Sequence, residues 1–438
     1  MRKRILALLL ITALCLTGCS MRTLDQMYCL PKRSEDHKEL RVEIEKAMAG
    51  LEYCAPSSGE NQQTLHTVDL DGDETPEYLL YARGGSERPL RILIFDEIAG
   101  AYAHVTTIEA NGSGFDMVEY ASMESGKGKQ IVFGCQISDQ PLRSLAVYRY
   151  ANGQAERLLA ANYSKFLTVD LDADSLAELF VLRPGNTDTD NGVAELYGME
   201  NGAMERSNEV NMSQPVDMLK RIIFSKLNDG EPAVYVASSV EDTALITDVY
   251  VYQESALVNV SLSSESGTSV KTLRNYYVYA DDIDNDGSVE LPALISMVPV
   301  QGTMGSDRHN LIRWYSLKLD GSEVDKQYTY HNFVGRWYLA LDSSWASYLT
   351  VQQQTNAYDF YVWSADFQQC QKVFTVHALT DVNRDTQSTQ DGRFVLLKTD
   401  STTFCATLYD AAQKYAITRD SVTRSFRLIE SEWKTGET

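Results

Sequence analysis

The chain has 438 residues and carries 61 acidic against 39 basic side chains, which gives a net charge of −22 at neutral pH. So acidic a surface argues against nucleic acid or anionic lipid as a partner, and it suits a calcium-rich exterior. The seven cysteines are scattered without a CxxC spacing. This argues against a thiolate metal site or a redox site, and favours small buried hydrophobic residues with at most one bridge.

The N-terminus has the pattern of a bacterial lipoprotein signal. Arg2, Lys3 and Arg4 precede an apolar stretch over 5–16, and small residues lead to Cys19. Cleavage after residue 18 and acylation of Cys19 by a lipid such as palmitate are expected. About a dozen apolar residues are fewer than the roughly 20 that span a bilayer. We expect a body on the extracytoplasmic face of the cell envelope, tethered to the membrane at Cys19; the alternative is a secreted protein with an incidental cysteine.

Residues 19–34 have no hydrophobic period and read as a tether. Over 35–49, Leu40, Ile44 and Ala47 or Met48 recur on one helical face, and Gly50 follows as a stop. The segment 35–60 therefore predicts one short helix and a lead-in, packed on a main domain that runs over 61–438.

From residue 62 the pattern changes to short runs of alternating polarity separated by turns. Strands are predicted around TLHTV, YLLYA, RILIF and AYAHVTTI, with a turn at Ala99 and Gly100 before the fourth strand. The next unit repeats this order, with a turn at Asn152 and Gly153. Each unit thus has four strands.

An acidic loop recurs between the first and second strands. Carboxylates stand at positions one, three, five and nine in three loops: Asp69, Asp71, Asp73 and Glu77; Asp170, Asp172, Asp174 and Glu178; and Asp282, Asp284, Asp286 and Glu290. In the second unit Ser122, Glu124, Gly126 and Gln130 take these positions. The recurrence indicates repeats of one structural unit.

The same frame places loop starts near 69, 122, 170, 225, 282, 339 and 381, so that seven units fit. The fourth keeps only Asp229, the sixth has no acidic set, and the seventh offers Asp381, Asn383 and Asp385, with Thr389 at position nine and Asp391 beyond it. We predict an all-β fold, a β-propeller of about seven four-stranded blades with one short N-terminal helix. A further strand near Phe426 leaves ring closure open, either by an exchanged strand or by an extra strand packed outside.

Four converging carboxylates stay ionised together only beside a cation, and all-oxygen ligation selects a hard ion. Calcium is favoured over magnesium because it accepts more ligands at flexible geometry, including a position-seven backbone carbonyl from Thr75, Leu176 or Ser288. The closing acid stands at nine rather than twelve, and a strand follows it, so the loops are not EF-hands. The alternative is an acidic turn exposed to water.

The repeat D-x-[DN]-x-D-x-x-x-[DE] between strands resembles the FG-GAP or VCBS repeats of the integrin α N-terminal propeller and its bacterial relatives. The resemblance covers 62–438, although only Phe133 and Gly134 match the Phe-Gly signature. It implies structural calcium between the first and second strands of a blade, held by the acidic residues named above.

The predicted function is a binding or interaction scaffold for a protein or glycan. Three long loops, 183–192, 263–272 and 300–310, are candidates for its contact surface. The alternatives are a propeller-based enzyme acting on extracellular glycans or other polymers, and a sensor or assembly partner of another envelope protein. Catalytic residues are not predicted, because the six histidines are isolated and no HExxH or GxSxG occurs. The five tryptophans read as packing residues rather than as a sugar platform.

Overall fold

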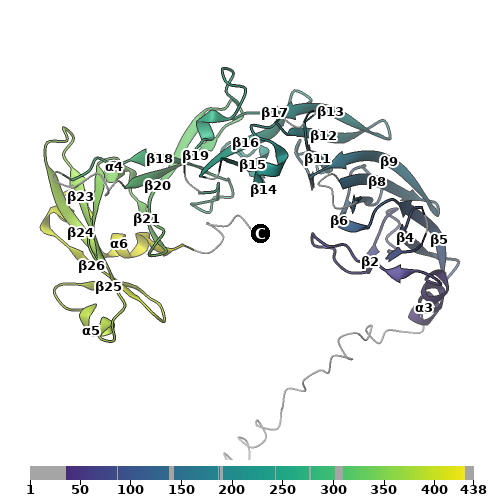
Figure 1. Ribbon diagram of the computed structural model, residues 1–438, viewed down its shortest axis with the longest axis horizontal. Helices are drawn as coiled ribbons and strands as arrows, with labels where there is room; N and C mark the ends of the chain where they lie inside the picture. Colours follow the sequence, from purple (N-terminus) through teal and green to yellow (C-terminus); the bar gives the residue numbers. More distant parts are fainter. Residues whose placement is uncertain are drawn as a thin grey trace, which may run out of the picture.

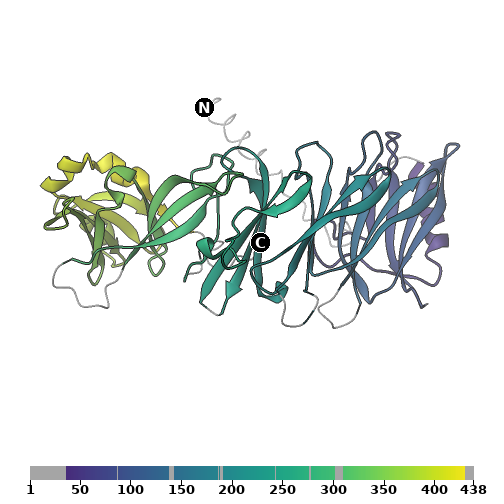
Figure 2. The same ribbon diagram turned by 90° about the horizontal axis from the view of Figure 1, so that it is seen from above.

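The computed structural model describes residues 36–85, 87–137, 143–185, 187, 191–241, 243–275, 278–300 and 309–429. These residues form six antiparallel sheets of four or five strands with a few short helices. The sheets stand side by side along an open arc (Figure 1), and their strands run across it when the molecule is turned (Figure 2). Within the described residues, no helix has the length and apolar character needed to cross a bilayer. The lipoprotein signal, Cys19 and the tether lie outside the described residues.

The first three sheets lie in the N-terminal half. The first sheet contains β1 (Glu52–Tyr53), β2 (Leu65–Val68), β3 (Glu77–Arg83), β4 (Leu90–Ile98) and β5 (Ala101–Ala110). The second contains β6 (Gly114–Ala121), β7 (Gln130–Gln136), β8 (Arg143–Ala151) and β9 (Gln154–Tyr163). The third contains β10 (Lys165–Val169), β11 (Glu178–Arg183), β12 (Val193–Glu200) and β13 (Ala203–Asn211).

The other three sheets carry the short helices between them. The fourth contains β14 (Leu219–Lys226), β15 (Pro232–Val240), β16 (Ala244–Gln253) and β17 (Ala256–Asn259), with η1 (Val216–Met218) before it and η2 (Val270–Thr272) after it. The fifth contains β18 (Leu291–Ser296), β19 (Asn310–Leu317), β20 (Glu323–Asn332), β21 (Trp337–Leu341) and β27 (Phe426–Leu428). The sixth contains β22 (Leu349–Gln353), β23 (Ala357–Trp363), β24 (Cys370–Leu379), β25 (Phe394–Lys398) and β26 (Thr403–Leu408), with α4 (Ser343–Ala346), α5 (Arg384–Gln387), η3 (Asp410–Tyr415) and α6 (Arg419–Ser425) around it.

Two-residue turns join the last two strands of each of the first three sheets. Both turn residues have positive φ at Ala99 and Gly100 (53° and 86°), at Asn152 and Gly153 (52° and 72°), and at Asn201 and Gly202 (50° and 83°). Such turns match the right-handed twist of a hairpin. The predicted turns at 99–100 and 152–153 are confirmed.

Apolar side chains from facing sheets form the cores. One cluster joins the first and second sheets through residues such as Ile92 and Phe133, and another joins the second and third through Val147 and Val181. Further clusters lie between each later pair of neighbours. The second to fifth sheets therefore bury both faces against their neighbours, which explains the nearly continuous apolar runs of their inner strands.

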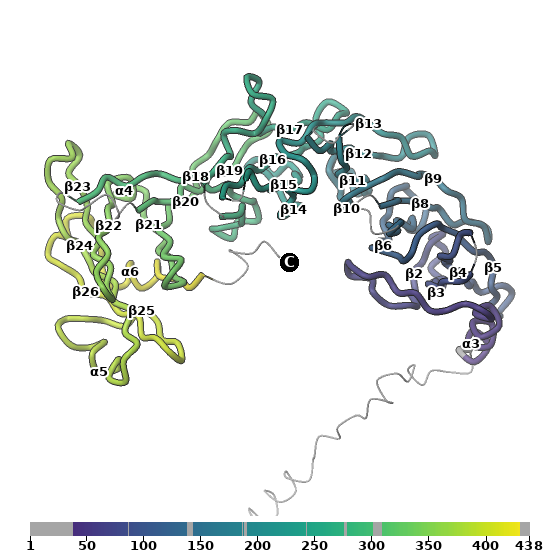
Figure 3. Tube along the Cα trace, viewed as in Figure 1, coloured from purple at the N-terminus to yellow at the C-terminus, as the bar shows by residue number. Residues whose placement is uncertain are grey.

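The predicted N-terminal helix is present as α3 (Asp36–Ala47). Leu40 is buried against Leu80, Leu93 and Phe95 of the first sheet, and Ile44, Ala47 and Met48 pack beside it. Gly50 has φ 80°, a backbone conformation that favours glycine and ends the helix. The helix covers the outer end of the arc (Figure 3).

The described residues form six sheets, where the sequence predicts about seven blades. Leu339 lies inside β21 rather than at the start of a loop, and the segment after 381 joins the sixth sheet through β25 and β26. The sixth predicted unit has no acidic loop to mark its start, so the spacing between units alone does not fix the number of sheets there. The strand expected near Phe426 is β27, an extra strand on the edge of the fifth sheet.

Tryptophans and cysteines serve mainly as packing residues. Trp314, Trp337 and Trp363 are buried, and Trp345 packs against the core that joins the fifth and sixth sheets. Cys135 and Cys405 are buried and Cys54 and Cys370 half-buried, and all four are free thiols. Trp433 and Cys29 lie outside the described residues.

Candidate metal centre

Three loops share one backbone shape. We call residues 69–77, 170–178 and 282–290 the first, second and third acidic loops. Positions four and six of each have positive φ: Gly72 and Glu74, Ala173 and Ser175, and Asn285 and Gly287. The left-handed residues alternate with the acidic positions, and curl each loop around its own side chains.

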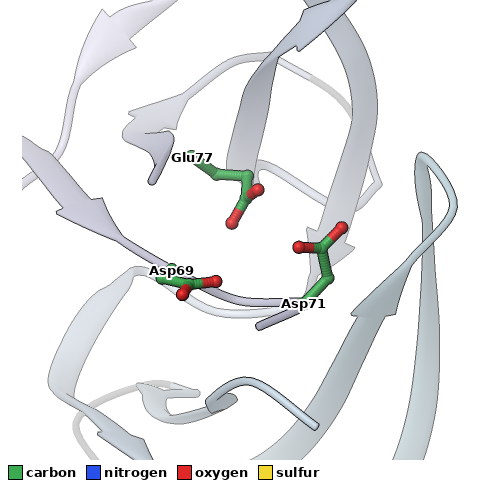
Figure 4. Close-up of side chains that lie close together, drawn as sticks. All are labelled: Asp69, Asp71 and Glu77. Atoms are coloured by element: carbon green, nitrogen blue, oxygen red, sulfur yellow. The ribbon is translucent and has the colours of Figure 1, made fainter. Parts of the chain in front are cut away.

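In each loop, the carboxylates of positions one, three and nine converge. One oxygen each from Asp69, Asp71 and Glu77 lie within 4.8 Å of one another, and the same limit holds for Asp170, Asp172 and Glu178 and for Asp282, Asp284 and Glu290. Figure 4 shows the carboxyl groups of the first loop turned toward one another. Three acidic groups at this separation could hold a metal ion.

The closing glutamate of each loop is anchored by the backbone. Its Oε2 accepts a hydrogen bond from the position-two amide: Leu70 N to Glu77 at 2.7 Å, Leu171 N to Glu178 at 2.8 Å and Ile283 N to Glu290 at 3.0 Å. Burial, which outweighs this bond, raises the pKa of each glutamate to about 7. In the absence of a cation these carboxylates are therefore costly to ionise at neutral pH.

The first and second loops each have a buried carboxylate oxygen without a hydrogen-bond partner. In the first loop it is Oε1 of Glu77, a residue with 0% exposure, and in the second it is Oδ1 of Asp170. A buried charged acceptor without a partner is costly, and a bound cation would satisfy it. The donor set is all oxygen, so these residues fit a hard divalent ion.

The position-five aspartates were expected to be metal ligands, but their carboxylates accept backbone hydrogen bonds within the loop. Asp73, Asp174 and Asp286 each accept the amide of position seven, from Thr75 at 2.7 Å, Leu176 at 2.7 Å and Ser288 at 2.8 Å. They fall outside the three-residue clusters. Fourfold convergence was expected, and the structure brings together three carboxylates. The role of the position-seven carbonyls stays a prediction.

Backbone hydrogen bonds connect loops of neighbouring sheets. The position-eight amide of one loop donates to the loop before it: Lys129 N to Asp69 O at 3.3 Å, Ala177 N to Ser122 O at 2.8 Å and Val289 N to Lys226 O at 3.3 Å. In the fourth sheet the corresponding residue is Pro232, the first residue of β15. Proline has no amide hydrogen, so it cannot donate this bond to the second acidic loop. A change in the backbone of one loop is therefore transmitted to the loop of the neighbouring sheet through these hydrogen bonds.

The loop of the second sheet, residues 122–130, has the same closing bond without the acid. Gln130 Oε1 accepts from Met123 N at 2.7 Å. Glu124, at position three, is paired with Lys127 Nζ at 2.9 Å and with Arg149 Nη1 at 2.8 Å. The Ser122 carbonyl accepts a hydrogen bond from Ala177 N, and Gly126 has a positive φ of 68°.

The fourth and seventh predicted loops have other shapes. Asp229 Oδ2 accepts the amide of Leu319 at 3.0 Å, so it joins the fourth sheet to the fifth. Asp381 and Asn383 precede the helix α5, and Asp385 within it is exposed and paired with Lys398 at 2.7 Å. Thr389 follows the helix, and Asp391 is exposed in a turn with φ 51°. The segment therefore differs in shape from the three acidic loops, because Arg384–Gln387 is helical, and the metal-binding role of Asp381, Asn383 and Asp385 stays a prediction.

Three further residues lie next to the acidic loops, and the loop pattern did not identify them. The charge of Asp96 on β4 helps to raise the pKa of Glu77 and Asp71, although burial is the largest cause. Ser316 donates to Oε1 of Glu290 at 2.6 Å, and Lys326 donates to Asp286 at 2.5 Å. The sequence could have indicated Asp96, because it stands three residues before the turn at 99–100. Lys326 has no such signal, because tertiary packing alone brings it next to the loop.

Comparison with known proteins adds little. No family model and no curated protein matches the chain. A crystal structure of a protein from Lactobacillus plantarum is similar at 10% identity over 72% of this chain and 85% of that one, with a TM-score of 0.27.

Proposed function

We propose that this chain is a lipid-anchored extracytoplasmic protein whose array of β-sheets is stapled by calcium and serves as a binding scaffold. The observation that supports this best is the threefold repetition of one loop, in which three carboxylates converge and one of them is a buried glutamate. The signal pattern that ends at Cys19 supports the anchor.

A calcium ion would be held by Asp69, Asp71 and Glu77 and by their counterparts in the second and third acidic loops. It would supply the positive charge that keeps these buried carboxylates ionised at neutral pH. Because the loop joins the end of β2 to the start of β3, ligation would fix those two strands to each other. The bond from Lys129 N to Asp69 O would pass that rigidity to the next sheet.

The repeat resembles FG-GAP or VCBS units, and we propose that each sheet is a blade of a propeller-type fold. Radial neighbours with cores between them support this proposal. The first and sixth sheets leave the arc open in Figure 1, so we propose a contact surface on an individual sheet rather than at a central channel.

A scaffold needs a rigid base for its loops, and the loop over 263–272 has one. Ser269 Oγ donates to the buried Asp248 at 2.5 Å, and Thr272 Oγ1 donates to the Thr247 carbonyl at 2.9 Å. Asp248 also accepts from Ser213 and Asn259. The loop, which exposes Leu262 and Val270 at its ends, is therefore held in place beside β16. Parts of the other two candidate loops lie outside the described residues.

The test of the scaffold is capture of ligand by the full chain on its membrane. Replacing 264–268 by a glycine and serine linker of equal length should leave the melting temperature and calcium response unchanged, because Ser269 and Thr272 stay. Binding to a glycan array or to envelope proteins should fall by at least tenfold. Equal binding by the altered and the original chain would contradict the assignment of this loop.

A further inference from the structure

One register position recurs beside the closing residue of four loops. Extending the strand pairing by one residue places Glu77 opposite Asp96, Gln130 opposite Arg149, Glu178 opposite Gly198 and Glu290 opposite Ser316. Next to each facing residue the pairing with the following strand shifts by one residue, and the extra residue lies on that following strand: Val105, Leu158, Ser207 and Lys326. We call this place the facing position. The same strand register therefore places the facing position beside the closing residue in all four sheets.

In the second sheet, the facing position carries a cation. Arg149 Nη1 lies 2.8 Å from Glu124, and Nη2 lies 2.7 Å from Glu156. The guanidinium and the Glu124 carboxylate are only 15% and 13% exposed. Lys127 adds a second positive charge on Glu124. The loop thus has a half-buried position-three carboxylate, a neutral closing residue and a permanent cation that comes from the adjacent strand β8.

In the acidic loops, the facing position carries no cation. Asp96 adds a negative charge beside the first loop and accepts from Tyr150 OH at 2.7 Å. Gly198 adds no side chain beside the second loop, and a Cβ built there would meet only the Glu178 Cγ, at 3.9 Å. Ser316 occupies one Glu290 oxygen in the third loop, and Lys326 neutralises Asp286. The electrostatic attraction for a divalent ion should fall in this order.

We propose that the facing position decides whether a loop takes a divalent ion, with Arg149 standing in for the ion in the second sheet and Asp96 strengthening the site in the first. The proposal rests on the proposed calcium binding and deepens it. It predicts three sites rather than four, tightest in the first acidic loop and weakest in the third.

Gly198 offers a matched pair of variants at one position. Its φ is not in the left-handed region and the space around it is open, so a side chain is tolerated. Gly198→Arg should place a guanidinium beside Glu178 and remove one of three calcium ions in a calorimetric titration of the full chain. Gly198→Asp should keep three ions and tighten one site by about three- to tenfold, because it repeats the arrangement of Asp96.

The outcomes distinguish failure of the proposed calcium binding from failure of the role of the facing position. A wild-type chain that binds no calcium would remove the proposed function and this inference with it. Three ions in the wild type and three of unchanged affinity in folded Gly198→Arg would overturn the inference alone. If Gly198→Arg does not fold by circular dichroism, Asp96→Asn decides: the tightest site should weaken about tenfold, with Tyr150→Phe as the control that removes only the hydrogen bond, and an unchanged tightest site overturns the inference.

Discussion

The first acidic loop and the loop over 122–130 are neighbours that solve one electrostatic problem in two ways. Both have nine residues, both bury the position-two side chain, Leu70 or Met123, and both close on its amide. In one loop three carboxylates converge, whereas in the other Arg149 and Lys127 neutralise the single carboxylate of Glu124. The comparison teaches that this end of the sheet needs positive charge, from a side chain or from an ion.

The largest effect should come from separating the two loops. A Cβ on Gly128 would lie 2.3 Å from the Leu70 carbonyl carbon, and backbone cannot yield as a side chain does. Gly128→Ala should lower the free energy of unfolding by about 3 kcal/mol. Urea titration measures it, and Gly114→Ala, where nothing lies within 4 Å, is the control that should lose little.

The next largest effect tests whether the Arg149 side chain supplies the positive charge in the loop over 122–130. Arg149→Gln leaves Glu124 half-neutralised in a place of low exposure, and should cost about 1–3 kcal/mol. The loss should be the same with calcium and with chelator, because no ion replaces the guanidinium. Rescue of the variant by calcium would contradict this, and thermal unfolding in both buffers is the measurement.

The first acidic loop should respond in the opposite sense. Glu77→Gln keeps the acceptor for Leu70 N and removes a buried charge, so in chelator at pH 8 it should gain about 1 kcal/mol or more. In calcium it should lose one bound ion and about a third of the calcium-induced stabilisation. A variant that is less stable in chelator and binds three ions would show that Glu77 is not a ligand.

The pH dependence of the chelated protein follows from the three closing glutamates. Their folded pKa of about 7 exceeds that of the unfolded chain, so their contribution is fully present below about pH 4.5 and is lost as pH rises through 7. The melting temperature in chelator should therefore fall between pH 5 and pH 8. Calcium should remove most of this fall, because it favours the ionised form; identical slopes in the two buffers would count against the sites.

The smallest effect is expected at Asp385, which the sequence predicts to be a metal ligand. The Asp385 and Lys398 side chains are 67% and 54% exposed, and such pairs contribute little. Asp385→Ala should leave the melting temperature and the calcium stoichiometry unchanged. Loss of one ion would restore the seventh loop as a site.

Local patterns in the sequence predicted the strands, the hairpin turns at Gly100 and Gly153, the helix that buries Leu40 and the three acidic loops. Each of these depends on residues close together in the chain. The number of units could not be predicted where no acidic loop marks the start of a unit, and β27 pairs with β21 from about 90 residues away. The facing residues Asp96 and Ser316 depend on strand register, which the loop spacing does not specify.

Thermal unfolding of the full chain in chelator and in 10 mM calcium tests the central claim most directly. Extracellular calcium modules bind at about 10⁻⁴ to 10⁻³ M, so each site should add about 1.4 to 2.7 kcal/mol by mass action. The account predicts a higher melting temperature in calcium, reversed by chelator and weaker with magnesium. A melting temperature that is the same in both buffers would contradict it.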